Sequence, residues 1–207
     1  MTTSSKPIQE QFGQVIIDAV SQFAAIDLPT VASLESGAFS HVGDAQMRKR
    51  LCEVFYGARW IYKLGLALLV KNEQQTAHVR AQITDYGAVC EGVLVDMIDH
   101  SMNKNIMSGS RYKFEDAVNK TKKIAWQFGK HRSVLGYRPL KWLIVVAEEE
   151  KIITPQCAKE LEWLRDKRNS VHIRWQSKGS YINTSRRVFE AVHLLLSDSK
   201  RWRTHHP

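Results

Sequence analysis

The sequence has few of the features that mark a disulfide-stabilised, secreted or membrane-spanning protein. Its only cysteines are isolated, with no CxxC pair and no histidine at metal spacing: Cys52, Cys90 and Cys157. This odd, scattered set fits reduced thiols better than a disulfide framework. The N-terminal residues MTTSSKPIQEQ lack the apolar core of a secretory signal. The most apolar stretch, Trp60 to Val70, is too short to cross a bilayer and contains Lys63. We therefore expect a cytoplasmic protein without a membrane partner.

Strand signals are also scarce. Only residues 173–175 and 151–153 have β-like composition, and no Asn-Gly hairpin is present. The sequence has no internal repeat, no low-complexity tract and none of the usual glycine-rich phosphate loops. A chain of 207 residues that is 43% hydrophobic can form one sizeable core. We expect a single all-α domain over residues 1–207, built as a helical bundle with short connections.

Helix signals recur along the whole chain. A serine or threonine cap followed by a first-turn proline predicts helices near Pro7 and Pro155, Asp44 is a further candidate cap, and Pro139 opens another helix. With the apolar spacing that follows, the expected helices cover about residues 7–28, 44–66, 77–100, 112–128, 139–147, 154–172 and 184–197. The core is expected over about residues 45–200, with helix 7–28 added to it. Residues 101–110 are predicted to be a loop, and 205–206 a solvated end.

The charge of the chain is unevenly balanced. Thirty Lys and Arg residues stand against 21 Asp and Glu residues, which gives a net charge of +9 and a pI near 9.5. Such an excess favours a polyanionic partner, RNA or DNA first, because each neutralised phosphate releases counterions. A basic pI is also common in proteins for which it serves only solubility. Charge by itself does not decide between these alternatives.

The stretch LRDKRNSVHIRW, which begins at Leu164, places several hydrogen-bonding groups at the end of an expected helix. At helical spacing, four of them share one stripe roughly 100° wide: Arg165, Arg168, Asn169 and His172. Arginine binds phosphate oxygens in a fork, and histidine titrates near neutral pH and passes protons. Asparagine can orient the imidazole or hold a substrate hydroxyl. The alternative is a solvated helix end, because the helix macrodipole alone favours each cation there by about 0.3–1 kcal/mol.

The run AEEEKIITPQCAKELEWLRDKRNSVH resembles the closing helical hairpin of the HEPN family of all-α domains. The family signature is an arginine, four to six residues and a histidine, and Arg165 and His172 enclose six residues. Arg168 and Asn169 supply the family's RN pair, although Arg168 is one residue closer to His172 than in the common form. The long helix of these domains carries an acidic residue, which Glu91 in the run CEGVLVDMI matches. The resemblance covers about residues 45–200 by helix order, and its specific part is 161–172.

The resemblance implies a metal-independent endoribonuclease without a cofactor, acting as a homodimer in which two copies of the motif face each other. In that mechanism His172 serves as base or acid while a 2′-hydroxyl attacks the adjacent phosphate. Arg165 and Arg168 neutralise the phosphate, and Asn169 orients the histidine. The products are a 2′,3′-cyclic phosphate and a 5′-hydroxyl. No metal is expected either, because six of the seven other histidines form no carboxylate-paired ligand set: His78, His100, His131, His193, His205 and His206.

A second basic region lies between residues 101 and 141. It holds ten Lys and Arg residues against Glu115 and Asp116, and its aromatic residues are Tyr112, Trp126, Phe128 and Tyr137. This composition suits phosphate contact with base stacking, and equally a helix whose aromatics lie in the core while its lysines face water. The residues that we expect to contact RNA are Lys120, Lys122, Lys123, Lys130, Arg132 and, beyond the first motif, Arg174.

Two other functional classes remain open. One is a HEPN-like domain without nuclease activity that binds RNA or serves as a dimerisation scaffold. The other is a toxin or antiviral-defence effector held silent by an antitoxin. In some such systems a nucleotidyltransferase modifies a tyrosine two residues after the histidine. Arg174 occupies that position here, so the sequence does not support this form of regulation.

Overall fold

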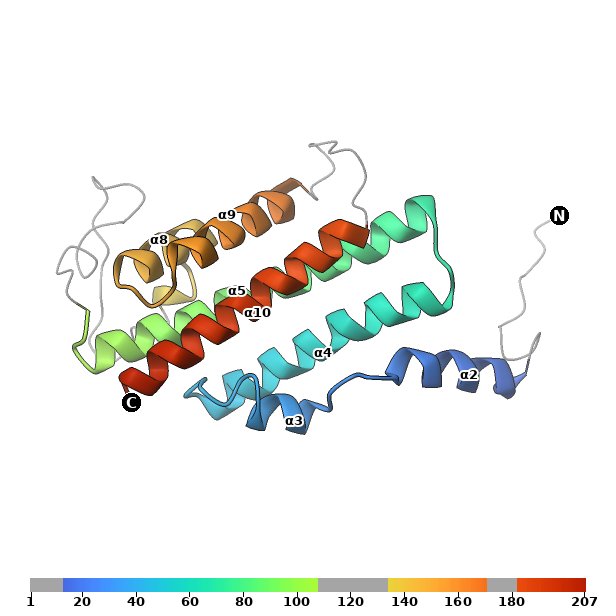
Figure 1. Cartoon of the computed structure of the whole chain (residues 1–207), viewed down its shortest axis with the longest axis horizontal. Helices are drawn as coiled ribbons and strands as arrows, with labels where there is room; N and C mark the ends of the chain where they lie inside the picture. The colour runs from blue at the N-terminus through green and yellow to red at the C-terminus, as the bar shows by residue number, and fades with distance from the viewer. Residues whose placement is uncertain (1–12, 108–133, 171–181) are drawn as a thin grey trace.

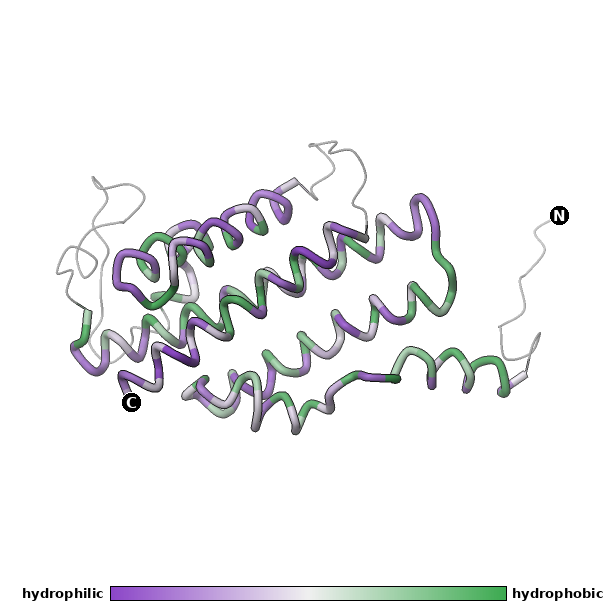
Figure 2. Tube along the Cα trace, in the orientation of Figure 1, coloured by the Kyte–Doolittle hydropathy of each residue, from purple (hydrophilic) through white to green (hydrophobic). Residues whose placement is uncertain are grey.

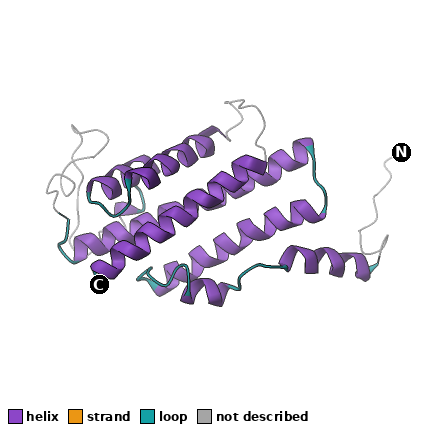
Figure 3. Cartoon of the chain, viewed as in Figure 1, coloured by secondary structure: helices purple, strands orange, loops and turns teal. Residues whose placement is uncertain are grey.

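The computed structural model describes residues 13–107, 134–170 and 182–207, and these residues form helices and loops without any strand (Figure 3). The helices are α2 (Gln14–Ala25), α3 (Val31–Ser36), α4 (Ala45–Ala67), α5 (Asn72–Asn103), α8 (Leu140–Glu149), α9 (Pro155–Ser170) and α10 (Ile182–His205). The predicted all-α architecture is confirmed. The β-like residues 151–153 form a turn, and residues 173–175 lie outside the described ranges. Among the described helices, none combines the length and apolar character that a membrane span needs.

Helix α5 is the axis of the bundle. Its 32 residues extend about 48 Å at the usual rise per residue. Helices α4, α8, α9 and α10 all contact it. In Figure 1, α10 lies along α5 in the same direction, whereas α4 and α9 lie against it in the opposite direction. A residue on α5 can therefore meet side chains from helices that are far away in the sequence.

The core is formed by the apolar faces of these helices. Tyr86, Leu94, Trp142 and Leu161 are each at most 1% exposed, and they come from α5, α8 and α9. On the α4 side, the ring of Phe55 contacts that of Tyr86 edge to face, with 5.8 Å between centroids. Burial of these large side chains is the main driving force that holds α9 against α5.

Helix α2 is attached to this bundle through α4. Its sequence is apolar, as the green tube in Figure 2 shows, yet much of that apolar surface is open. Val15 is 80% exposed and Ile16 is 47% exposed. Near the other end of α2, Lys63 of α4 lies 3.9 Å from Asp27.

Local capping explains where several helices begin. The N–H of Met47 donates to Oδ1 of Asp44 over 2.7 Å at the start of α4, and Pro139 directly precedes α8. At the start of α9 the N–H of Cys157 donates to Oγ1 of Thr154 over 3.2 Å. Both caps were predicted from the sequence, and both are confirmed.

Other boundaries differ from the predictions. Helix α3 was not expected, and Ser101–Asn103 continue α5 instead of starting a loop. Helix α10 extends to His205, whose side chain is exposed as expected for a solvated end, whereas His206 is partly buried. The His206 ring stacks on Trp202 with 4.5 Å between centroids, and its carbonyl accepts a 2.8 Å hydrogen bond from Nε2 of His100. The expected helix 112–128 and the first part of helix 7–28 lie outside the described residues.

Candidate functional site

The last turns of α9 carry the described part of the predicted site. Arg165, Arg168 and Asn169 all belong to this helix, which ends at Ser170. His172 and Arg174 fall in residues 171–181, outside the described ranges, so the position of the predicted proton carrier is not described. The arginines and the asparagine can therefore be compared with one another and with α5, but not with the histidine.

Arg168 meets Glu91 across the interface between α9 and α5. Nη1 of Arg168 lies 2.5 Å from Oε1 of Glu91, and the two residues are 77 positions apart in the sequence. Their side chains are 29% and 33% exposed, so the pair is partly shielded but accessible from outside. Charge-assisted bonds of this kind are among the stronger polar contacts in proteins. The structure thus brings together two of the residues that the sequence singled out.

Arg165 does not join this pair. Its Nη2 and Nε both contact Oδ1 of the adjacent Asp166, over 2.6 Å and 3.1 Å. For Arg165, Arg168 and Asn169 the expected stripe holds for the backbone positions, but the Arg165 guanidinium is turned toward its neighbour in the chain. Asn169 is exposed. Of the two arginines, only Arg168 contacts the acidic residue that was assigned to the site.

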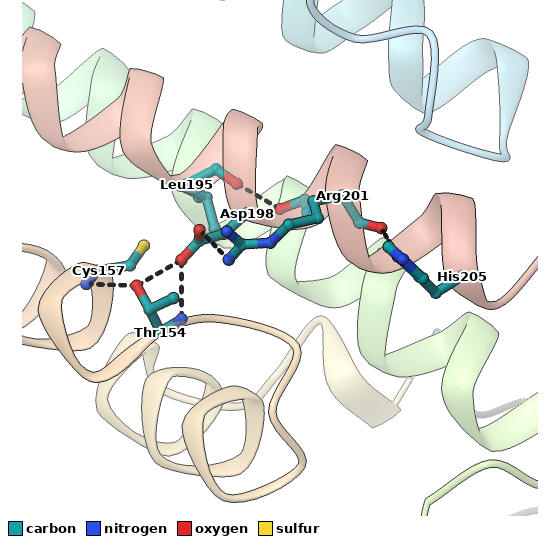
Figure 4. A network of polar contacts seen from close by, with 7 residues as sticks. Thr154, Cys157, Leu195, Asp198, Arg201 and His205 are labelled. Atoms are coloured by element: carbon teal, nitrogen blue, oxygen red, sulfur yellow. Dashed lines mark hydrogen bonds and ion pairs between the residues drawn. The ribbon is translucent and has the colours of Figure 1, made fainter.

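Helix α9 is fixed to α10 at its first turn, as the close view in Figure 4 shows. The backbone N–H and the hydroxyl of Thr154 both donate to Oδ2 of Asp198, each over 2.7 Å. Arg201 donates to the other oxygen of the same carboxylate over 2.8 Å. Asp198 is only 3% exposed, so its charge is stabilised almost entirely by these contacts. This contact fixes the start of α9, the helix that carries Arg168 to Glu91 of α5.

A second link between α9 and α10 was not seen in the sequence. Arg187 makes two contacts with the Glu160 carboxylate, over 2.8 Å and 3.2 Å, and its guanidinium lies 4.0 Å from the centre of the Trp163 ring. The Arg187 contact lowers the pKa of Glu160. Glu160 and Trp163 show no recognisable pattern with Arg187, because the three residues meet only after α9 and α10 pack together.

The cysteines contribute no nucleophile to the site. All three are free and buried. Burial raises the pKa of the Cys90 thiol well above its usual range, although nearby Arg168 opposes the shift. Burial likewise raises the pKa values of Cys52 and Cys157. These thiols stay protonated near neutral pH, and a protonated thiol is a poor nucleophile.

Most of the second basic region lies outside the described residues. That includes every predicted RNA contact in it: Lys120, Lys122, Lys123, Lys130 and Arg132. Of its aromatic residues only Tyr137 is described, and it is 83% exposed. The chain leaves α5 toward this region at Asn103, about 18 Å along the helix from Glu91.

Among the described residues, a polar pocket lies away from Arg168. It has a volume of about 380 Å³ and is lined by Gly43, Asp44, Asp96, Asp99, His100, Asn103 and Arg203, with no residue from α9. Its carboxylate Asp96 accepts a 2.9 Å hydrogen bond from the N–H of Gly43 and so ties the segment before α4 to α5. Among the described residues, no three His, Cys, Asp or Glu side chains are grouped as a metal site requires.

Comparisons with protein-family models, with curated proteins and with solved structures find no match to this chain. The likeness to the HEPN family therefore rests on the residues between Leu161 and His172 and on the order of the helices. The contact between Arg168 and Glu91 is an independent, geometric reason to treat the end of α9 as a candidate site.

Proposed function

We propose that the chain is a metal-independent endoribonuclease of the HEPN type, acting on RNA in the cytoplasm. The observation that carries this proposal is the ion pair between Arg168 and Glu91, over 2.5 Å at the partly exposed end of the α9–α5 interface. It provides an oriented cation four residues before His172 in the chain. An arginine can stabilise the charge on a phosphate and a histidine can move a proton, and metal-independent cleavage of RNA can use both.

In the proposed reaction His172 takes the proton from a 2′-hydroxyl, whose oxygen then attacks the adjacent phosphorus. The 5′-oxygen leaves and receives a proton, so the products are a 2′,3′-cyclic phosphate and a 5′-hydroxyl. Arg168 stabilises the charge that grows on the phosphate, Arg165 provides a further phosphate contact, and Asn169 orients the imidazole. A second copy of the chain supplies the other histidine, so the active form is a homodimer.

The test is RNA cleavage by the wild type and by His172→Ala, assayed with a chelator present and with mapping of the product ends. We expect the variant to lose cleavage and to keep its helix content, because the substitution removes a proton carrier. His205→Ala is the matched control, since His205 is an exposed histidine on α10. Equal cleavage by the wild type and His172→Ala, or cleavage that the chelator abolishes, contradicts the proposal.

A second candidate function is an RNA-binding or dimerisation scaffold without catalysis. It is favoured by the fact that Glu91 and Asp166 already neutralise Arg168 and Arg165. An arginine paired in this way binds phosphate only if the phosphate competes with the carboxylate or shares the guanidinium with it. Salt-sensitive RNA binding with no cleavage by the wild type selects this candidate. Toxicity on expression that depends on His172 selects a toxin or defence effector.

A further inference from the structure

Arg168 reaches Glu91 by crossing the surface of α5 at a glycine. A Cβ atom at Gly87 would lie 2.7 Å from Cδ of Arg168 and 3.2 Å from its Nε. Real Cβ atoms essentially never come that close to another heavy atom, so any larger residue at position 87 moves the arginine. Gly87 lies one helical turn before Glu91 on α5. The Arg168 side chain passes over Gly87 and then reaches Glu91, so both residues determine its position.

Nothing else about position 87 calls for glycine. It lies in the interior of α5, with a backbone that other residues can adopt. Glycine is among the least favourable residues for a helix interior, because it gives up the most backbone freedom. The close approach of Arg168 is the feature of the fold that uses the missing side chain.

We propose that Gly87 is a positioning residue for Arg168, and that the space above it fixes the guanidinium where RNA phosphate is bound. This inference rests on the proposed ribonuclease function. Arginine has five N–H donors, and among the described residues Arg168 commits only Nη1, to Glu91. The aliphatic part of the side chain is held at Gly87 and Nη1 is held by Glu91, so the remaining N–H donors keep a fixed direction. A fixed donor stabilises a transition state better than a mobile one, because it needs no reorganisation during the reaction.

The test compares Gly87→Ala with Gly92→Ala. Gly92 is the matched control because it lies on the same helix and a Cβ there is also crowded, at 2.5 Å from Cδ2 of Leu51 on α4, but it does not touch Arg168. In single-turnover cleavage of RNA, Gly87→Ala should be about 10- to 100-fold slower, with RNA affinity changed far less. Gly92→Ala should cleave at the wild-type rate. Equal rates for the wild type and Gly87→Ala overturn the proposal.

An NMR measurement on the arginine Nε–H signals separates this inference from the proposed function. The Arg168 signal, assigned with Arg168→Ala, should shift and exchange faster with water in Gly87→Ala but not in Gly92→Ala. If the wild type does not cleave RNA, the ribonuclease proposal fails, and this spectrum alone decides whether Gly87 seats Arg168. An unchanged Arg168 signal in Gly87→Ala contradicts the proposal that Gly87 positions the Arg168 side chain.

A stability measurement covers the case in which Gly87→Ala folds poorly. Arg168 has a flexible side chain that is partly exposed, so removing it relieves the crowding at position 87. Adding Arg168→Ala to Gly87→Ala should therefore raise the Tm, whereas Arg168→Ala in the wild type should not. A double variant that melts no higher than Gly87→Ala contradicts the inference.

Discussion

Glu91 of α5 and Arg168 of α9 form an ion pair with 2.5 Å between Oε1 and Nη1, and both side chains remain about one-third exposed. The pair places a negative charge beside the cation that we propose for phosphate binding. The carboxylate has two opposite effects. It holds the guanidinium in one orientation, and it competes with RNA for the same positive charge.

Glu91→Gln separates these effects, because it keeps the shape of the side chain and removes its charge. We expect tighter RNA binding, with a salt dependence steeper by about one phosphate contact, and a slower single-turnover rate. Fluorescence anisotropy between about 50 and 200 mM salt measures the RNA affinity and its salt dependence, and rapid-quench cleavage measures the single-turnover rate. Weaker RNA binding by this variant contradicts the competition between Glu91 and phosphate.

The two arginines of α9 should have different roles. Arg168 is four residues before His172 in the chain and is oriented by Glu91, whereas Arg165 is seven residues before it and is paired with Asp166. Arg168→Ala should therefore lose turnover far more than RNA affinity, and Arg165→Ala should mainly weaken binding and flatten its salt dependence. The family spacing favours the opposite assignment. Single-turnover rates and salt titrations of both variants decide between the two assignments. Unchanged rates in both variants mean that neither arginine takes part in catalysis and that this stretch is only a basic helix end.

Assembly provides a separate prediction. One copy of the motif has one histidine, whereas the proposed cleavage uses a base and an acid on opposite sides of the phosphate. We expect an isologous two-fold dimer that brings two His172 rings to one groove. Light scattering should give the mass of two chains at micromolar concentration. Mixing His172→Ala with the wild type should reduce activity per wild-type chain, and a monomer that cleaves RNA contradicts this arrangement.

Sequence patterns predicted those parts of the fold that depend on neighbouring residues. The caps at Asp44 and Thr154 act within three residues of themselves, so their signals are local. The extension of α10 depends instead on the stacking of His206 on Trp202 and on the bond from His100, about 100 residues earlier. Trp202 and His206 are four residues apart, which is a local helical spacing, but no pattern in the last residues contains the bond from His100. Helix α3 was missed because six residues are too few to show a helical pattern.

The candidate site likewise has a part that the sequence predicted and a part that it did not. Helical spacing put Arg165 and Arg168 on one face, but it could not show that Arg165 turns to Asp166 while Arg168 turns to α5. Glu91 was singled out by the family resemblance and not by its own pattern. Gly87 had no signal at all, because its importance depends on the crossing of two helices. Side-chain partners depend on how the helices pack against one another, and no short stretch of sequence contains that information.

The anchor of α9 gives a prediction about stability. Asp198→Ala removes a buried carboxylate that accepts two hydrogen bonds from Thr154 and one from Arg201. We expect a loss of about 3 kcal/mol in the free energy of unfolding, because the Thr154 N–H is left without its acceptor. The control is Glu190→Ala, since Glu190 forms an exposed pair with Arg186 and should change stability by less than about 0.5 kcal/mol. Urea unfolding of both variants checks this, and equal midpoints contradict the anchoring role of Asp198.

His41 should make the stability depend on pH. Burial lowers its pKa to about 4, Lys200 and Arg203 add to the shift, and Asp96 opposes it. The unfolded chain binds a proton near pH 6.5, so stability is fully present above that pH and falls as the pH drops toward 4. Between pH 7 and pH 5 we expect a loss of about 2 kcal/mol from this residue. Burial also lowers the pKa values of His100 and His193, which adds to the same trend.

The variant His41→Phe isolates this effect. The ring nitrogens of His41 form no hydrogen bond of good geometry among the described residues, and only a weak contact with the Ala38 backbone raises its pKa, so phenylalanine can fill the same space at little cost. At pH 7 the variant should be at least as stable as the wild type, because a buried polar group is replaced by an apolar one. Its urea midpoint should fall much less than that of the wild type between pH 7 and pH 5. Parallel losses in the two proteins contradict the assignment of this pH dependence to His41.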